Sequence, residues 1–444
     1  MCHTQPDAAD ATLQELRGPA TEERSVASGL HRVETGRNGV PVNNAAMDAI
    51  PARASRRDAL QVRIVRGLDE LEAVRGAWHR LWRSVESCAV YSLPEYVIPY
   101  LRHRLPPDRE WAGVLVLDAG QLIGVFPAVY GPAELLPRLG CRFLSPYEFL
   151  PDCVVAAERA EEVFPEILRG LGEAVPGWRR LDLNEVREDS PTAKFLDHPP
   201  VGYRLRRVVC GHGSYLPTTG SFEDYYRGLS HNFRGNLRKA RRKLEQLRDV
   251  RPLLQSPGRF DEADFQRFVD LEASGWKGAQ GEAIKKRETW VNFYREFIAG
   301  LARANCLALN FLAAEDRVIA AQLGIHTGSR LSILKIAYDE NYARCAPGNL
   351  LWSMQLEAAF ASDEIREVDA LSDMPWHRDW KMRRRSYYSL RIVPRSLLPT
   401  LVTFYEEKVP GARACAKRAL GRIPGLLPLV QSIRHGGPGA GHGQ

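Results

Sequence analysis

The chain has 444 residues, of which 44% are hydrophobic and 26% are charged, and its formal net charge is +7. A chain of this length is expected to form two or three domains, each large enough to bury a hydrophobic core. The composition excludes a collagen, a coiled coil and a chain that is disordered throughout.

Cysteine spacing and apolar patterning indicate the compartment. Eight cysteines are scattered singly, without a C-x-x-C pair, so neither a zinc ribbon nor a disulfide framework is expected. Residues 1–30 lack the apolar stretch of a signal peptide, and no run of about 18 apolar residues predicts a transmembrane segment. These patterns favour a cytoplasmic protein in a reducing environment.

The two ends of the chain are expected to lie outside the folded body. Residues 1–58 contain no aromatic residue, which predicts a disordered N-terminal extension. Residues 396–434 are expected to form a C-terminal helical region, with Leu397, Leu398 and Phe404 on its apolar side. The glycine-rich residues 435–444 predict a disordered tail.

The first folded region is predicted over residues 59–215. Helical spacing of apolar residues indicates two helices, over 69–86 and after Pro94. Two strands joined at Asp118-Ala119-Gly120 form a predicted hairpin. The remaining elements, in chain order, are a helix (159–174), a strand (181–186), a short helix (191–198) and a strand (203–209).

The second folded region is predicted over residues 216–395. Its expected elements are helices over 222–227, 231–248, 265–276 and 290–302, strands over 306–315, 318–328 and 330–339, a helix over 347–362 and a short strand in 366–373. The order of strands, crossover helix and strand echoes residues 112–186. The fold class predicted is α/β, with two tandem, related mixed-sheet domains and flanking helices.

One junction between a strand and a helix has the pattern of an anion site. In IAYDENYARCAPGNLLW, Pro347 suits the first turn of a helix and Gly348 allows a ligand close to the backbone. The N–H groups of Gly348, Asn349 and Leu350 are expected to point outward at the positive end of the helix dipole, where phosphate or pyrophosphate binds. An ordinary Pro-Gly helix start without a ligand is the alternative.

Positive charge concentrates in the helix predicted over 231–248. Its apolar residues form one stripe, and the other faces carry Arg and Lys. Such faces are often merely solvated, but they also bind anionic small molecules, anionic membrane surfaces or nucleic acid. Phe233 belongs to the apolar stripe, and the basic faces have no aromatic residue, which disfavours nucleic acid.

Further candidates lie before and after that junction. Trp276 and Lys277 follow a helix and either shape a pocket or fill the core. In the preceding strand, Ile333, Lys335 and Ala337 are expected on one face and Leu334, Ile336 and Tyr338 on the other.

Two titratable groups complete this set of candidates. Asp339 could accept a proton or belong to a turn, and His377 could be a base or a structural residue. No metal-binding motif occurs, so no metal is expected.

The segments SHNFRGNLRKARRKLEQ, ASGWKGAQGEAI and IAAQLGIHTGSRLSILKIAYDENYARCAPGNLLW together resemble the CelD-like group of GNAT acetyltransferases, which is linked to cellulose and exopolysaccharide biosynthesis. More distantly they resemble the FemAB-type peptidyltransferases, which use paired GNAT-like domains. The resemblance covers residues 220–390 and extends over 60–215 only in the order of elements. The general GNAT pattern is Gln/Arg-x-x-Gly-x-Gly/Ala, of which this chain keeps Arg344 and one glycine, Gly348, displaced by one position.

The resemblance implies an N- or O-acyltransferase that moves an acyl group, in the first place acetyl, from acetyl-CoA or another acyl-CoA to an amine or hydroxyl. The acceptor would be a small molecule, a glycan or a peptide, in polysaccharide or cell-envelope biosynthesis. The strand 331–338 would lie beside the pantetheine arm. The pyrophosphate would bind at the turn 346–350, and the implied coenzyme-binding residues are Arg344, Pro347, Gly348, Asn349 and Leu350.

The resemblance also implies roles near the reacting groups. Asp339 would be the base, Lys335 or Tyr338 would lie near the reacting carbonyl, and Trp276, Lys277 and His377 would contact the acceptor. Two alternatives stay open. A FemAB-like peptidyltransferase would use an aminoacyl-tRNA donor, held by the basic helix that could otherwise bind the 3′-phosphate of coenzyme A. A non-catalytic binding protein of the polysaccharide machinery would bind neither donor.

Overall fold

The protein is described as a computed structural model covering residues 60–85, 89–132, 142–145, 152–197, 200–254, 258–275, 281 and 283–395. The expectations for residues 1–58, 396–434 and 435–444 therefore concern parts of the chain outside the described residues.

The first half of the described chain contains the predicted elements in the predicted order, together with three strands that were not predicted, β1, β4 and β5. Its elements are β1 (Leu60–Val65), α2 (Leu68–Arg83), η2 (Val90–Ser92), α3 (Pro94–His103), β2 (Glu110–Asp118), β3 (Gln121–Pro132), β4 (Arg142–Ser145), β5 (Val154–Val155), η4 (Ala157–Arg159), α4 (Ala160–Ala174), β6 (Trp178–Arg187), α5 (Pro191–Phe195) and β7 (Tyr203–Pro217). The predicted hairpin between β2 and β3 is confirmed, with Ala119 and Gly120 both at positive φ, 47° and 84°.

The second half contains two strands that the sequence did not predict. Its elements are α6 (Phe222–Gly228), α7 (His231–Leu244), β8 (Arg251–Leu254), α8 (Glu262–Ser274), η5 (Ile284–Lys286), α10 (Glu288–Arg303), β9 (Leu307–Ala314), β10 (Arg317–Thr327), β11 (Arg330–Tyr338), η6 (Glu340–Cys345), α11 (Pro347–Ala361), β12 (Glu367–Asp369), η7 (Pro375–Arg378) and β13 (Arg383–Pro394). Strands β8 and β13 begin with arginine, and the basic run at the start of β13 concealed its strand pattern.

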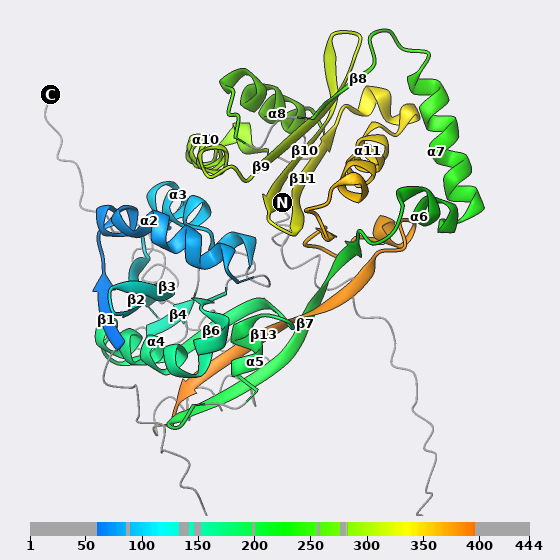
Figure 1. The fold of residues 1–444 in the computed structure, drawn as a ribbon. Coiled ribbons are helices and arrows are strands. Elements are labelled where there is room, and N and C mark those ends of the chain that lie inside the picture. Colours follow the sequence, from blue (N-terminus) through cyan, green and yellow to red (C-terminus); the bar gives the residue numbers. More distant parts are fainter. Residues whose placement is uncertain are drawn as a thin grey trace, which may run out of the picture. The chain divides into compact units, whose positions relative to one another are not determined.

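The described strands form one mixed sheet with helices against its faces, which confirms the predicted α/β fold class (Figure 1). The strand order is β1-β2-β3-β4-β6-β13-β7-β12-β11-β10-β9-β8, and β5 pairs with β3. Strand β13 comes last in the sequence but lies between β6 and β7, with antiparallel pairing to both. The sheet thus runs without interruption through both predicted domains, and the boundary at residue 215 remains a prediction.

The same connection occurs once in each half. Strand β4 pairs in parallel with β6, and helix α4 lies between them in the sequence. Strand β11 pairs in parallel with β12, and helix α11 lies between them. Parallel neighbours need such a crossover, so the predicted echo between the two halves holds at the level of elements.

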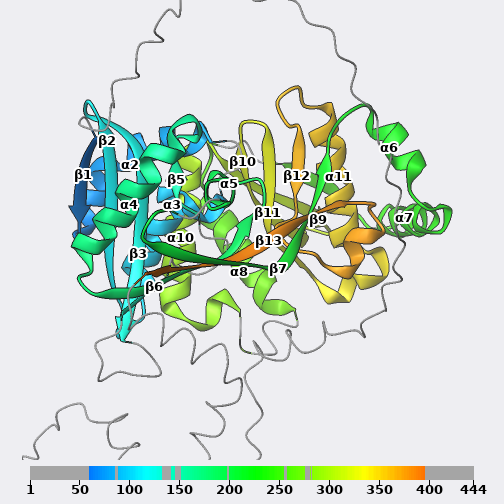
Figure 2. The same ribbon diagram turned by 90° about the horizontal axis from the view of Figure 1, so that it is seen from below.

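Aromatic side chains join the two halves on one side of the sheet. The ring of Tyr96 in α3 meets the rings of Phe293 and Phe297 in α10 edge to face, with centroids 5.2 and 5.4 Å apart. This contact belongs to a hydrophobic cluster that contains α2, α3, α8 and α10 (Figure 2). A separate cluster packs α7 and α11 against the sheet in the second half.

Candidate functional site

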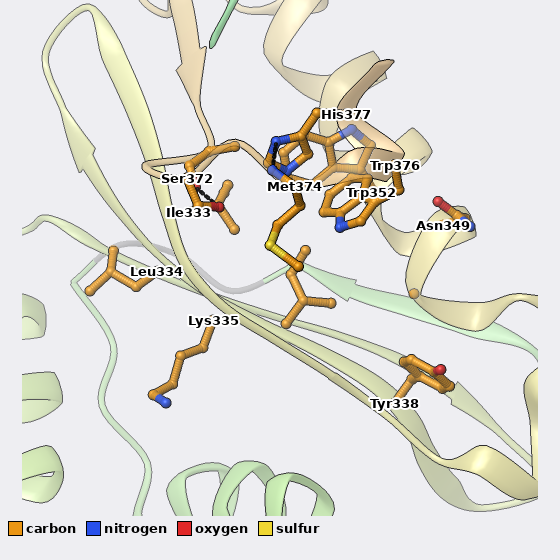
Figure 3. A pocket seen from close by; sticks show the side chains of 13 residues that line it. Ile333, Leu334, Lys335, Tyr338, Asn349, Trp352, Ser372, Met374, Trp376 and His377 are labelled. Carbon is orange, nitrogen blue, oxygen red and sulfur yellow. Dashed lines mark hydrogen bonds between the residues drawn. The ribbon is translucent and has the colours of Figure 1, made fainter. Parts of the chain in front are cut away.

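A pocket forms where two parallel strands separate. Strand β11 pairs with β12 only from Arg330 to Ser332, and beyond that point residues 333–338 pair only with β10 within the described chain. The chain leaving β12 forms the opposite wall. The pocket has a volume of about 470 Å³, typical of a ligand site. Its lining residues are Ile333, Leu334, Lys335, Ile336, Tyr338, Gly348, Asn349, Trp352, Ala370, Ser372, Met374, Trp376 and His377 (Figure 3).

A β-bulge at Leu334 changes which side chains share a face of β11. Leu323 of β10 pairs with Lys335 and Gly324 pairs with Ile333, so Leu334 has no opposite residue. Ile333 and Ile336 consequently pack with the α11 cluster, while Leu334 and Ala337 pack with the α8–α10 cluster. The strict alternation predicted from sequence is therefore wrong, because one extra residue shifts the period of two.

The start of helix α11 faces the pocket. Ala346 precedes it in a left-handed conformation (φ 43°), Pro347 is buried at the first position, and no side chain caps the helix. Gly348 and Asn349 line the pocket. The prediction for Leu350 is wrong: its N–H donates to the Ala346 carbonyl at 3.1 Å, and its side chain is buried in the core.

Gly348 lies against Tyr338 without crowding. A Cβ atom added at Gly348 would meet Cδ1 of Tyr338 at 3.5 Å and Cγ2 of Ile336 at 3.8 Å, which are ordinary van der Waals distances. Asn349 is held from the other side, because its Oδ1 accepts a hydrogen bond of 3.4 Å from Nε1 of the buried Trp380. The first turn of α11 is thus fixed next to the pocket with room for a ligand at Gly348.

Aromatic and imidazole rings form one wall of the pocket. Trp352 is 1% exposed, and its Nε1–H has no hydrogen-bond partner among the described residues. Its ring stacks on His377 at 6.4 Å and meets Trp376 edge to face at 5.2 Å. A buried N–H donor beside a cavity is costly unless a ligand or water accepts its hydrogen bond, so this wall fits a ligand with carbonyl groups.

His377 is a neutral hydrogen-bond donor at this wall. Burial lowers the pKa of His377 to about 4, and Asp373 only partly opposes that effect. Its Nδ1 accepts a hydrogen bond of 3.1 Å from the Met374 N–H, so the proton of the neutral ring is assigned to Nε2. This tautomer disfavours the predicted role as a base, because Nε2 has no lone pair to receive a proton.

Lys335 extends to the other face of β11. Its Nζ lies 3.5 Å from Oε1 of Glu272 and 5.4 Å from the centre of the Tyr294 ring. Figure 3 shows its side chain directed away from Trp352 and His377. Glu272 is 3% exposed, and its Oε2 accepts the Ile284 N–H at 2.9 Å. Sequence reasoning missed Glu272, although an acid among the apolar residues of a helix such as α8 is a signal.

The remaining predicted residues lie elsewhere. Oδ1 of Asp339 accepts hydrogen bonds of 2.9 Å from the backbone and side chain of Asn341, which makes it the N-cap of η6, and Asp339 does not line the pocket. Arg344 is exposed in η6 and does not line it either. Trp276 and Lys277 lie outside the described residues. The structure brings together five predicted residues: Lys335, Tyr338, Gly348, Asn349 and His377.

The described residues lack two kinds of feature, a group that could hold a metal ion and a helix that could span a membrane. No group of three or more His, Cys, Asp or Glu side chains there could hold a metal ion. No helix in the described ranges is long and apolar enough to span a membrane.

Comparison with known proteins shows which family model and which solved structures this chain resembles. Residues 231–382 match the family model of the acetyltransferase (GNAT) domain. No curated protein matches the chain. The crystal structure of FemX is similar with a TM-score of 0.54 and 10% identity, and the match covers 75% of this chain and 98% of that one.

Two further structures match over similar lengths. The C-terminal domain of a putative lysylphosphatidylglycerol synthetase from Agrobacterium fabrum has 11% identity and a TM-score of 0.46 over 76% of this chain and 97% of that one. A tandem GNAT protein from the clavulanic acid biosynthesis pathway has 12% identity and a TM-score of 0.41 over 76% and 99%. Residues 231–382 thus match the GNAT acetyltransferase domain, and the fold of the chain is similar to that of FemX.

Proposed function

We propose that the protein is an acyltransferase that moves an acyl group, in the first place acetyl, from acyl-CoA to an amine or hydroxyl acceptor. The observation that carries this proposal is the pocket between the separated strands β11 and β12, which opens beside the uncapped N-terminus of α11. The GNAT domain match over residues 231–382 supports the same chemistry.

The first turn of α11 suits the pyrophosphate of the donor. No side chain caps the helix, so the N–H groups of Gly348 and Asn349 are free of side-chain acceptors at the positive end of the helix dipole. Gly348 has no side chain to keep an anion from the backbone. Coenzyme A carries an anionic pyrophosphate, and we place that group at the first turn of α11.

The unpaired edge of β11 suits the pantetheine arm. Residues 333–338 present backbone groups to the pocket on the side where β12 has ended. An extended chain that carries amide groups can pair with such an edge as an added strand would. The Nε1–H of Trp352 and the Nε2–H of His377 supply two further donors for carbonyl oxygens of the arm or of the thioester.

Transfer would occur where β11 leaves the pocket. The acceptor nitrogen or oxygen forms a bond with the carbonyl carbon, the carbon–sulfur bond breaks, and the acceptor's proton ends on the released thiol. Lys335 and Tyr338 line the pocket, and we place them near the carbonyl. The Lys335 ammonium is directed to Glu272 on the other face of β11, so the N–H donors of Trp352 and His377 are the groups that we place at the negative charge developing on the oxygen.

Calorimetric titration with acetyl-CoA tests this proposal on three proteins. We expect wild type to bind, and Gly348→Ala to bind within about threefold of wild type because its Cβ meets only ordinary contacts. Gly348→Glu should bind at least about 100-fold more weakly, because a carboxylate repels the phosphates. Absence of binding to wild type, or equal binding by the Glu variant, would contradict the proposal.

The nature of the acceptor is a finer proposal. We keep a glycan, peptide or small-molecule acceptor in polysaccharide or cell-envelope biosynthesis, as the CelD-like resemblance implies. One observation favours a second candidate, the FemAB-like use of an aminoacyl-tRNA donor: the fold match to FemX. That donor would show binding of charged tRNA that weakens steeply with salt. A non-catalytic protein would bind neither donor.

A further inference from the structure

Helix α7 and residues 378–383 form a surface that is rich in unpaired cations, here called the basic surface. Its exposed cations are Arg238, Lys239, Arg241, Arg242 and Lys243 on α7, Arg378 at the end of η7, Lys381, and Arg383 at the start of β13. Helix α7 contains no Asp or Glu. None of these eight cations has a carboxylate within ion-pair distance among the described residues, whereas the neighbouring Arg384 pairs with Asp373 at 2.5 Å. Asp379 is the one acidic residue within 378–383, so the surface keeps a strong excess of positive charge.

Tertiary packing brings the two basic segments together next to the pocket. The Phe233 ring at the start of α7 meets the ring of Trp380 edge to face at 5.0 Å. Trp380 is fully buried and donates its Nε1–H to Asn349, a residue that lines the pocket. The basic surface consequently begins at the border of the pocket and continues along α7, which lies beside α11 (Figure 1).

The shape of the basic surface fits a broad partner. The apolar stripe of α7 is already used inside the protein, since Leu237, Ala240 and Leu244 are at most 6% exposed. Cations flank this stripe on both sides from Arg238 to Lys243, over about 8 Å of helix, and together with Arg378, Lys381 and Arg383 they are more than one phosphate group can contact. With its apolar residues buried, α7 can bind only through charge and cannot insert into a bilayer.

We propose that the basic surface binds the anionic headgroups of a lipid bilayer, so that the protein works at a membrane surface. Adsorption through clustered Lys and Arg is typical of proteins that bind anionic lipids. The sequence after the described residues adds a second signal, because 408–434 contains six Lys or Arg, no Asp or Glu, and many Leu, Ile and Val. RNA is the less favoured partner, because no exposed residue of α7 is Phe, Tyr or Trp, the large aromatic side chains on which bases stack.

Vesicle co-sedimentation of the full-length protein tests the proposal. The vesicles are phosphatidylcholine alone, or phosphatidylcholine with about one third phosphatidylglycerol, which sets the surface potential. We expect binding only to the anionic vesicles, lost at high salt because exposed charges are then screened. Arg238→Glu/Arg241→Glu should weaken binding about 25-fold or more, since each cation near an anionic surface contributes about a factor of five.

A matched control changes the net charge equally at another site. Arg80→Glu/Arg83→Glu alters two exposed arginines at the end of α2, and it should bind anionic vesicles within about twofold of wild type. Circular dichroism and thermal unfolding show whether the α7 variant keeps its fold.

Three results would overturn the proposal. The first is equal binding to both kinds of vesicle. The second is undiminished vesicle binding by the α7 variant. The third is α7-dependent binding of a transfer RNA without binding to vesicles.

Discussion

At the scale of single residues, His377 combines a buried ring with a fixed tautomer. Because burial lowers its pKa to about 4, His377 stays neutral across physiological pH. An unfolded histidine titrates near 6.5, so this group stabilises the fold fully above that pH and progressively less as pH falls toward 4. The ring is thus an uncharged hydrogen-bond donor beside the pocket across physiological pH.

We expect the imidazole resonances of His377 to show a neutral ring down to about pH 5, as NMR titration of the ring can measure. His377→Phe should lower kcat for acyl transfer by about 10²-fold with its fold retained, because the Nε2–H donor is lost from a buried wall. A ring that titrates near pH 6.5 would contradict the assignment. His103→Phe, which replaces a histidine paired with Glu296 outside the pocket, serves as the control.

His79 illustrates the opposite shift. Its Nδ1 lies 3.0 Å from Oε2 of Glu95, and its Nε2 lies 3.9 Å from Sγ of Cys306 in the other half. Burial alone would lower the pKa of His79, but the hydrogen bonds with Cys306 and Glu95, together with the charge of Glu95, raise it to about 9.

This raised pKa makes stability depend on pH. The contribution of His79 is fully present below about pH 6.5, the unfolded value, and is lost as pH rises through 9. Urea unfolding between pH 6 and pH 9.5 should show a decline of about 2–3 kcal/mol in wild type that is absent in His79→Gln. The same slope in both proteins would show that another group is responsible.

At the scale of elements, η6 joins strand β11 to helix α11. Asp339 caps η6 through Asn341, and η6 leads directly into α11. Capping of η6 therefore explains the position of Asp339, and no proton transfer by its carboxylate is needed to explain it.

Two variants of Asp339 separate these roles. Asp339→Asn should keep turnover within about threefold, because asparagine also caps helices well, whereas Asp339→Ala should cost about 1 kcal/mol of stability. Turnover and thermal unfolding of both variants measure this. A large loss of turnover in the Asn variant with normal acetyl-CoA binding would instead support Asp339 as the base.

At the scale of the whole molecule, buried charges and a shared strand join the two halves. Nη1 of Arg187 in β6 donates to Oδ2 of Asp369 in β12 at 3.0 Å, and both side chains are buried. Strand β13 lies between β6 and β7 in the same region. The halves are therefore joined by a buried ion pair and by continuous strand pairing.

We expect calorimetry of the full chain to show a single unfolding transition for the described body. Arg187→Met should lower its stability by about 3–5 kcal/mol, because Asp369 is then a buried, uncompensated charge. Arg187→Met/Asp369→Leu should recover much of that loss. Two separate transitions, only one of them shifted by Arg187→Met, would show that the halves unfold independently.

Most elements could be predicted from local sequence patterns, for local physical reasons. Helical spacing marked α2 and α3, the Asp118-Ala119-Gly120 turn marked a hairpin, and Pro347-Gly348 marked the start of α11 beside the pocket. The sequence missed β13, because its arginines find partners on distant strands: Arg385 pairs with Glu367 at 2.6 Å. A local pattern cannot contain such a partner.

By itself, then, the sequence determined the mixed α/β class, the order of most elements and five of the residues that meet at the pocket. Only the tertiary structure decided three other features: the bulge at Leu334, the neutral tautomer of His377 and the pairing of Lys335 with Glu272. Each depends on a neighbour that is distant in sequence or on a change of backbone register. The net charge of +7 shows the same difference between sequence and structure. Composition gives the size of this charge, whereas the tertiary contact between Phe233 and Trp380 brings the two basic segments together.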